Sequence, residues 1–180
     1  NRRPASETHH EDKPVRLAVK GLSREKPPLD PHGIALHDIS FHVHAGEVLG
    51  IAGLVGAGRT EVARCLFGAD AFTSGSFELD GVPYQPRDPL YALDHGVALV
   101  PEDRKKHGII PIMCVGKNIT LSSLPQFCFG KNVINEALEE TVINQSIQKL
   151  KVKTSSPELA IGRLSGGNQQ KAILAKCLLL

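Results

Sequence analysis

The stretch GLVGAGRT, Gly53 to Thr60, carries the residue types and spacing best suited to binding phosphate in this sequence. Its glycines follow the pattern GxxxxGK[ST], in which backbone N–H groups turn inward around phosphate oxygens and a Cβ would block the approach. The Thr60 hydroxyl suits Mg²⁺, and a helix beginning at Thr60 would attract an anion through its dipole. The sequence therefore predicts a phosphate site, with Thr60 as the metal ligand, made by Gly53, Gly56, Ala57, Gly58, Arg59, Thr60 and Glu61.

Arg59 departs from this pattern, because the position normally holds lysine. Lysine is a compact point charge that reaches the β- and γ-phosphates, whereas arginine is longer, planar and forked. We expect phosphate binding at this loop to survive and hydrolysis there to be impaired. Taken alone, the stretch is also compatible with an ordinary glycine-rich turn between a strand and a helix.

A second candidate site is LSGGNQQK, Leu164 to Lys171, which precedes a helical pattern in AILAKCLLL. Ser165 is expected to cap that helix, and Gly166 and Gly167 would leave the first-turn N–H groups open to a phosphate. A serine followed by two glycines is, by itself, only a good helix start. The complete string is far more specific.

The elements that must position these residues alternate between strands and helices, which favours an α/β core. A helical insertion is expected over about residues 112–163, within a domain covering 15–180 that follows a polar linker at 1–14. Alternating and apolar runs predict strands at 39–43, 47–52 and 97–100, and Asp80-Gly81 predicts a hairpin over 76–84. Helices are expected at 60–67, 89–96, 115–121 and 135–151, the last with an apolar stripe of Leu138, Val142, Ile143, Ile147 and Leu150.

Composition excludes several other classes of protein. The chain has 180 residues, 21 basic and 19 acidic, and the net charge of +2 gives no basic surface for nucleic acid. No apolar run approaches the length of a membrane span, and the charged start lacks a signal-peptide core. The four cysteines form no CxxC pair, so reduced thiols are expected. These features predict a soluble protein of the cytoplasm.

LSGGNQQK is similar to the signature motif of ATP-binding cassette (ABC) transporters. Together with GLVGAGRT and VPEDRKKHGI it makes the chain from Val15 onward resemble the second cassette of bacterial sugar-importer ATPases. IMCVGKNITLSSL and the last thirty or so residues resemble most the D-xylose importers of that family. The resemblance implies a P-loop (RecA-like) α/β core with an antiparallel β subdomain and a helical insertion. It also implies that the chain stops before the Walker B strand.

The resemblance further implies that two cassettes pair head to tail, with each ATP between the glycine loop of one and the signature of the other. Gly53 to Thr60 would then form one site. Glu102, in VPED, falls where many cassettes have a glutamine that senses the γ-phosphate, although it is also compatible with an exposed loop acid. No aromatic residue for adenine stacking lies between Leu22 and Leu36, where His32 is a possible substitute. The other cassette's ATP would be completed by Leu164, Ser165, Gly166, Gly167, Asn168 and Gln169.

The function implied by the resemblance is the ATP-hydrolysing subunit of a monosaccharide importer, with ATP and Mg²⁺ as cofactors and D-xylose as the expected sugar. Its partners would be the first cassette, in the same or a second polypeptide, the membrane permease subunits and, indirectly, a periplasmic sugar-binding protein. Nucleic acid is not an expected partner, and the location would be the cytoplasmic face of the bacterial inner membrane. This stretch alone would not hydrolyse ATP. One alternative is a cassette ATPase without transport, regulatory or associated with nucleic acid, which would keep the signature motif. Another is a kinase or a GTPase, but these two classes do not need LSGGNQQK.

Overall fold

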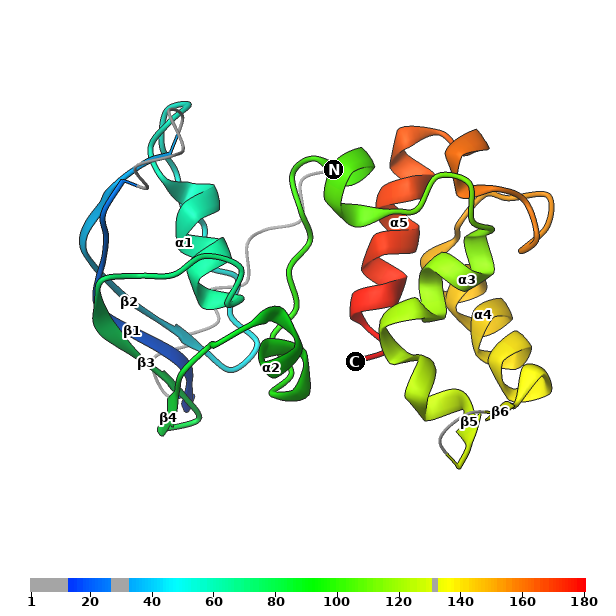
Figure 1. The fold of residues 1–180 in the computed structure, drawn as a ribbon, viewed down its shortest axis with the longest axis horizontal. Coiled ribbons are helices and arrows are strands. Elements are labelled where there is room, and N and C mark those ends of the chain that lie inside the picture. Colours follow the sequence, from blue (N-terminus) through cyan, green and yellow to red (C-terminus); the bar gives the residue numbers. More distant parts are fainter. Residues whose placement is uncertain (1–12, 27–32, 131–132) are drawn as a thin grey trace, which may run out of the picture. The chain divides into compact units, whose positions relative to one another are not determined.

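The computed structural model describes residues 13–26, 33–130 and 133–180, and it divides the chain into two compact units. The first spans residues 1–95 and the second spans residues 96–180 (Figure 1). The first unit contains β1 (Val15–Arg24), β2 (Leu36–His44), α1 (Arg59–Leu66), β3 (Ser74–Leu79), β4 (Val82–Tyr84) and α2 (Pro89–Asp94). The second contains η1 (Arg104–Gly108), α3 (Val115–Thr120), η2 (Leu121–Phe127), β5 (Cys128–Phe129), β6 (Val133–Ile134), α4 (Glu136–Leu150), η3 (Ile161–Arg163) and α5 (Gly166–Cys177).

An antiparallel sheet with the strand order β2-β1-β3-β4 forms the base of the first unit. The central strand is β1, in which Val19 pairs with Phe41 of β2 on one side and with Phe77 of β3 on the other. Alternate side chains turn to one face, as the period of two requires, and β2 confirms the strand predicted at 39–43. The buried apolar residues of this unit are Val19, Leu22, Leu36, Val62, Cys65, Phe77, Tyr84 and Ala92.

Local turn chemistry was sufficient to predict the hairpin and the helix that follows it. Asp80 and Gly81 have φ angles of 51° and 77°, the left-handed values that a two-residue hairpin turn needs. Phe77 of β3 pairs with Tyr84 of β4, which confirms the hairpin. The carboxylate of Asp88 accepts a hydrogen bond from the Tyr91 N–H at 2.8 Å, so it caps α2 at its N-terminus as expected.

The strands predicted at 47–52 and 97–100 are wrong, because the structure has no strand at either place. Val48 is 94% exposed and Ile51 is 49% exposed, and Val100 is 49% exposed. An apolar run forms a strand only where neighbouring backbone completes its hydrogen bonds. Among the described residues no segment pairs with these two runs, so the apolar pattern alone is not enough to make them strands.

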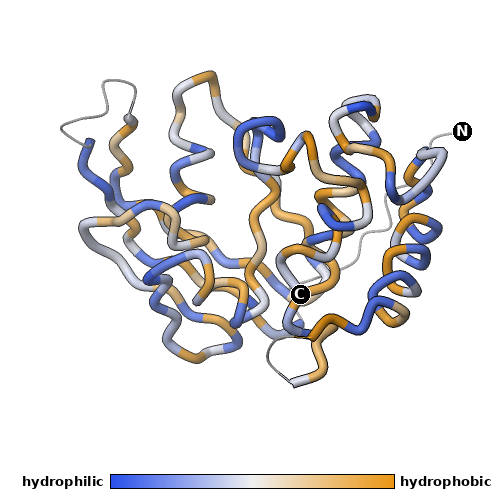
Figure 2. Tube along the Cα trace, turned by 45° about the vertical axis from the view of Figure 1, so that its right-hand side comes forward, coloured by the Kyte–Doolittle hydropathy of each residue, from blue (hydrophilic) through white to orange (hydrophobic). Residues whose placement is uncertain are grey.

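The second unit is helical, and α3, α4 and α5 pack around one apolar cluster. The helices predicted at 115–121 and 135–151 correspond to α3, continued by η2, and to α4. Asn135 caps α4 by accepting a hydrogen bond from the Leu138 N–H at 3.2 Å, and Lys151 ends it with a φ of 50°. Hydrophobic and hydrophilic residues alternate along the helices of this unit (Figure 2). The cluster consists of Ile109, Val115, Ile119, Val152, Ile161, Ala172, Ile173 and Ala175.

The predicted apolar stripe of α4 is only partly right. Ile143 is buried, but Leu138 is 44% exposed, and the adjacent Glu139 is buried in its place at 1% exposed. The Glu139 carboxylate accepts hydrogen bonds from the Lys117 ammonium and the Thr120 hydroxyl of α3, both at 2.6 Å. These two partners compensate for the burial of the charge. Helix α4 therefore presents Glu139 to α3, although a hydropathy pattern predicts that an acid lies at the surface.

None of the helices in the described part of the chain is long and apolar enough to cross a membrane.

Candidate functional site

The glycine loop lies in the first unit, and its residues 53–57 are exposed. Gly56 and Gly58 both have a φ of 83°, a left-handed conformation that side chains other than glycine rarely adopt. A Cβ on Gly58 would also come within 2.6 Å of Leu36 Cδ2. The Ala57 N–H donates to the Leu54 carbonyl at 3.0 Å, which closes the turn. The backbone therefore needs these glycines to reach α1.

Helix α1 begins directly after the loop, at Arg59, and corresponds to the helix predicted at 60–67. Its N-cap is Gly58, which has no side chain with which to cap the first turn. Thr60 is exposed in that turn, and Glu61 contributes the only first-turn acid. The turn thus offers backbone N–H groups, the positive end of the helix dipole and a hydroxyl, which together suit a phosphate accompanied by Mg²⁺.

The Arg59 side chain folds back over the loop that precedes it. Its Cδ and Nε lie 3.6 and 3.8 Å from the point where a Cβ on Gly53 would be. The aliphatic part of the side chain therefore lies beside Gly53, at the start of the loop. Arginine can neutralise a phosphate from there, but its planar fork fills more of the space than a lysine ammonium does.

The second glycine turn starts α5 in the second unit, and its geometry corrects one prediction. Ser165 is the N-cap residue by position, with φ −60° and ψ 154°, but its side chain makes no capping hydrogen bond. Its Oγ accepts a hydrogen bond from the side-chain amide of Asn168 at 2.9 Å instead. The backbone N–H groups of Asn168 and Gln169 both donate to the Ser165 carbonyl at 3.0 Å. The first-turn N–H groups of Gly166 and Gly167 are thus left to an outside acceptor.

Leu164 and Gln169 face the protein interior rather than solvent. Leu164 packs against the apolar cluster, and Gln169 is 4% exposed. The Gln169 Nε2 donates to the carbonyls of Ile161 and Leu164 at 3.2 and 3.1 Å, and its Oε1 accepts from Arg104 Nε at 3.0 Å. Leu164 and Gln169 therefore support the turn from the interior side, while Ser165 and Gly167 form its exposed surface.

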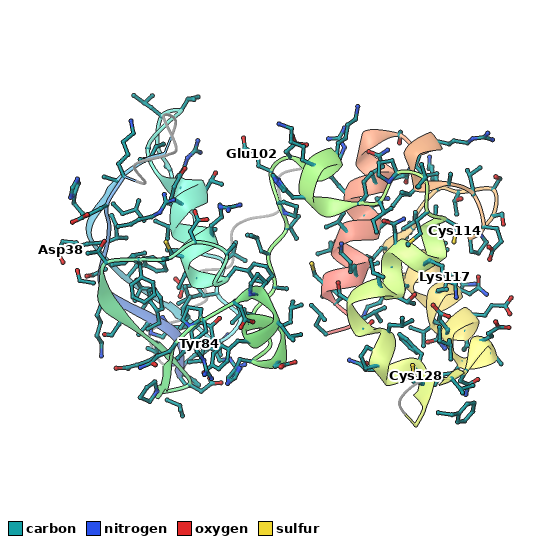
Figure 3. The ribbon with its side chains drawn as sticks, in the orientation of Figure 1. Asp38, Tyr84, Glu102, Cys114, Lys117 and Cys128 are labelled. Atoms are coloured by element: carbon teal, nitrogen blue, oxygen red, sulfur yellow. The ribbon has the colours of Figure 1, made fainter. Side chains whose placement is uncertain are left out.

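Glu102 is exposed on the segment just before η1 (Figure 3). The next residue, Asp103, accepts backbone hydrogen bonds from Lys105 and Lys106 at 3.1 and 3.2 Å. The bond from the Lys106 N–H is the main reason why the pKa of the Asp103 carboxyl is lowered. A fixed turn therefore follows Glu102 and brings Arg104 onto the start of α5.

The structure brings together part of the predicted site within each unit. Residues 53–61 form one surface in the first unit. In the second, the segment after Glu102 contacts the turn formed by 164–169 through Arg104, a residue that is not among the predicted site residues. Arg104 and Gln169 are 65 residues apart in the sequence, so local sequence patterns do not reveal this contact. His32, named as a possible partner for adenine, lies outside the described residues.

Comparison with known proteins agrees with this geometry. Residues 36–180 match the ABC transporter family, and the chain therefore belongs to that family. It is 64% identical over 154 residues to the xylose import ATP-binding protein XylG of Histophilus somni, covering 85% of this chain and 31% of that protein. It is 56% identical to the XylG protein of Escherichia coli strain K12, again over 85% of this chain, and covers 30% of that protein. The chain thus spans about a third of the length of these relatives.

Solved structures confirm the predicted fold of an ABC ATPase core. A cassette named MJ0796, in a dimeric post-hydrolysis state bound to ADP and Pi, has a TM-score of 0.71 at 17% identity and covers 91% of this chain and 69% of that one. A nucleotide-free cassette from an ABC transporter has a TM-score of 0.71 at 16% identity and covers 92% of this chain and 65% of that one. The antiparallel sheet beside α1 and the helical second unit are therefore parts of an ABC cassette.

Proposed function

We propose that the chain is a nucleotide-binding domain of an ATP-driven monosaccharide importer, with D-xylose as the sugar. The observation that carries this is the identity of 64% and 56% to two xylose import ATP-binding proteins across most of the chain. The exposed glycine turns at α1 and α5 support it, since both present uncapped first-turn N–H groups to an anion. Transport would consist of ATP-driven closing and hydrolysis-driven opening of a cassette pair.

In this proposal the chain is the second cassette, preceded by a linker or tail at residues 1–14, and it pairs with a first cassette in the same or a second polypeptide. Residues 15–180 form the domain, and residues 112–163 its helical subdomain. The membrane permease subunits would dock on the domain at the cytoplasmic face of the bacterial inner membrane. A periplasmic sugar-binding protein would take part indirectly.

The chemistry proposed is phosphoryl transfer from ATP to water, in which positioning and charge stabilisation do most of the catalysis. Gly53 to Glu61 would bind one ATP through backbone N–H groups and the α1 dipole, with Arg59 beside the phosphates. The Thr60 hydroxyl would hold Mg²⁺, which neutralises phosphate charge when bound. On the other ATP, the N–H groups of Gly166 and Gly167 and the Ser165 hydroxyl would stabilise the γ-phosphate, supported by Leu164, Asn168 and Gln169. Glu102 would report on the γ-phosphate from the segment before η1.

Complementation tests the proposed function directly. The complete protein should restore D-xylose uptake to a bacterial strain that has its permease and sugar-binding protein but lacks its own xylose import ATPase. D-ribose uptake in the same strain serves as the control for the sugar. ATP hydrolysis without uptake of any monosaccharide would instead support a cassette ATPase that has no transport function.

Exchange of the loop cation should change nucleotide affinity. We expect Arg59→Lys to bind Mg-ATP about five- to tenfold more tightly, because a compact ammonium leaves room for the phosphates beneath it, and tenfold corresponds to about 1.4 kcal/mol. Titration calorimetry on the complete protein measures this, with the loop of the other cassette inactivated so that one site remains. Equal affinity of the two proteins would show that the loop accommodates arginine without loss, and weaker binding by the lysine form would contradict the prediction.

A further inference from the structure

Arg104 is the residue that joins the segment after Glu102 to the start of α5. Its Nε donates a hydrogen bond to Gln169 Oε1 at 3.0 Å. The guanidinium also lies directly beside Gly166, because a Cβ built on Gly166 would come within 2.6 Å of the Arg104 NH2 nitrogen and 3.0 Å of its Cζ. One side chain thus covers the first residue of the helix and holds an amide in its second turn.

The hydrogen bond from Arg104 helps to determine which way the Gln169 amide points. Gln169 is 4% exposed, so its polar atoms depend on protein partners. Its nitrogen already faces two carbonyl oxygens, those of Ile161 and Leu164, at 3.2 and 3.1 Å. If the amide turned over, its oxygen would face both carbonyls and its nitrogen would face the guanidinium, which leaves acceptors against acceptors and donors against donors. Arg104 and the two carbonyls therefore hold the amide together in one orientation.

The amide in turn fixes the backbone that leads into the exposed turn. The two carbonyls it binds lie at the start of η3 and at Leu164, immediately before Ser165. The peptide units from Leu164 to Gly167 determine where the first-turn N–H groups of α5 point. A displacement of about 1 Å at such a turn is enough to weaken catalysis strongly.

We propose that Arg104 is a positioning residue: acting through Gln169, it holds the Leu164–Gly167 turn in the geometry that binds the phosphates of the other cassette's ATP. This inference rests on the proposed function, in which that turn contacts ATP. In this role Arg104 acts through its hydrogen bond to Gln169, whereas the exposed lysines of the same segment, Lys105 and Lys106, do not take part. This arrangement also gives Gly166 a role, since a side chain there would displace the guanidinium.

Removing Arg104 should leave the fold intact, because the same segment has two other attachments to α5. The Lys176 ammonium donates to the Gly108 carbonyl at 2.7 Å. Gly108 also packs so closely on Ile173 that a Cβ would meet its Cδ1 at 2.6 Å. Asp103 holds the backbone of the turn independently, through its bonds to the two lysine N–H groups.

The test compares Arg104→Met with the wild type in the complete importer, by the ATP dependence of hydrolysis. We expect the apparent KM for ATP to rise about fivefold, on the scale of one ordinary lost hydrogen bond, because a misplaced turn weakens the ATP-closed state. Lys106→Met is the matched control: it removes a cation from the same segment, where the side chain is 76% exposed, and should leave KM within about twofold. A purely structural loss would lower the amount of active protein, and so the apparent kcat, without changing KM.

Two further variants separate the route through Gln169 from the effect of charge alone. Arg104→Lys places a methylene where Nε lies and an ammonium near Cζ, so it keeps the charge and loses the hydrogen bond. Its KM should stay within about twofold of that of Arg104→Met, and the effects of Arg104→Met and Gln169→Leu should not multiply when combined. Wild-type KM in the lysine variant, or multiplying effects, would overturn the proposal.

The same assay separates this inference from the proposed function. If the wild-type importer hydrolyses ATP and Arg104→Met has the wild-type KM, the role of Arg104 is wrong and the transport function stands. If the wild type neither hydrolyses ATP nor moves a sugar, the proposed function fails, and with it the phosphate contact on which the role of Arg104 depends.

Discussion

Gly166→Asp should reduce ATP hydrolysis by the complete protein, in the proposed importer, at least about a hundredfold while the domain stays folded. The substitution places a carboxylate beside the first-turn N–H groups that are proposed to stabilise the γ-phosphate, so one anion excludes another. Loss of one such group of donors costs about a hundredfold or more in kcat in other enzymes. The fold should survive because the nearest atoms to the new Cβ belong to the far end of the flexible Arg104 side chain. ATPase rate and thermal unfolding of the same preparation measure the two effects.

Gly166→Ala is the control at the same position, since it adds the Cβ without the charge. It should push the guanidinium aside, since the new Cβ would come within 2.6 Å of it, and lower the rate far less than aspartate does. Hydrolysis at the normal rate by the aspartate variant would show that this turn does not face a phosphate. Equal losses in the alanine and aspartate variants would assign the effect to the displaced Arg104 instead of the added charge.

The sequence was a good guide wherever a few neighbouring residues determine the structure. The Asp80-Gly81 hairpin, the Asp88 cap and the glycine turn before α1 depend on local φ angles and on side chains one to three residues away. Turns and caps that follow such short-range rules can be predicted from a single sequence. Ser165 is the exception, because its hydroxyl accepts a hydrogen bond from the Asn168 side-chain amide and not from a backbone N–H of the first turn.

Features that depend on distant partners were missed or misread. Residues 47–52 and 97–100 have the composition of buried strands, but composition does not supply a neighbouring strand. The bond between Arg104 and Gln169 joins residues 65 apart, and neither has a sequence pattern that signals the other. The burial of Glu139 beside an exposed Leu138 likewise depends on what α3 presents to α4. Hydrogen bonds between buried polar groups that are far apart in the sequence are therefore the features of this cassette that a single sequence predicts least well.

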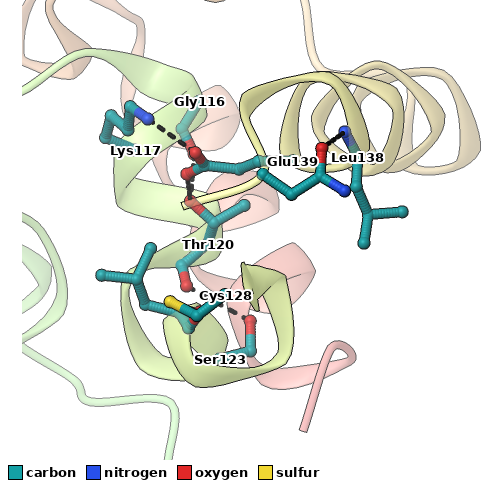
Figure 4. Close-up of polar contacts among 9 residues, drawn as sticks. Gly116, Lys117, Thr120, Ser123, Cys128, Leu138 and Glu139 are labelled. Carbon is teal, nitrogen blue, oxygen red and sulfur yellow. Dashed lines mark hydrogen bonds and ion pairs between the residues drawn. The ribbon is translucent and has the colours of Figure 1, made fainter. Parts of the chain in front are cut away.

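The ion pair between Lys117 and Glu139 is buried at one end only, and its two halves should therefore contribute unequally to stability. The Glu139 side chain is 1% exposed, whereas that of Lys117 is 47% exposed. Figure 4 shows the Glu139 carboxylate between the Lys117 ammonium and the Thr120 hydroxyl. Burial by itself raises the pKa of the Glu139 carboxyl, but the hydrogen bonds from Lys117 and Thr120 and the charge of Lys117 outweigh it, so the pKa is lowered overall.

Acid should therefore weaken the contact between α3 and α4. Because the pKa of Glu139 is lower in the folded state, its stabilisation is present above the unfolded pKa of about 4.3 and is lost as the pH falls through the folded value. The hydrogen bond to Glu139 is the main cause that raises the pKa of Lys117, so the stabilisation from Lys117 is complete below its unfolded pKa of about 10.4 and is lost above its folded one. The pair should thus stabilise the second unit fully between about pH 4.3 and pH 10.4.

Lys117→Met should destabilise the second unit by about 2 kcal/mol at pH 7, because it leaves a buried carboxylate with the Thr120 hydroxyl as its remaining partner. Glu139→Gln should cost less than about 1 kcal/mol, since the amide still reaches Thr120 and the half-exposed lysine can turn to water. Hydrogen exchange of the amides in α3 and α4, in the complete protein, gives the free energy of local opening for each variant. Equal costs for the two substitutions would contradict the asymmetry that burial predicts.

The matched control is Lys20→Met in the first unit. Lys20 forms an ion pair with Glu78 at 2.7 Å, almost the same distance as the 2.6 Å of the buried pair, but with side chains 61% and 34% exposed. Water screens charges in that position, so its loss should cost about 0.5 kcal/mol or less. If the two lysine substitutions had the same effect, distance rather than burial would govern both pairs. The expected fourfold difference would instead make Glu139 the buried acid whose hydrogen bonds join α4 to α3, the helix that packs in turn against α5.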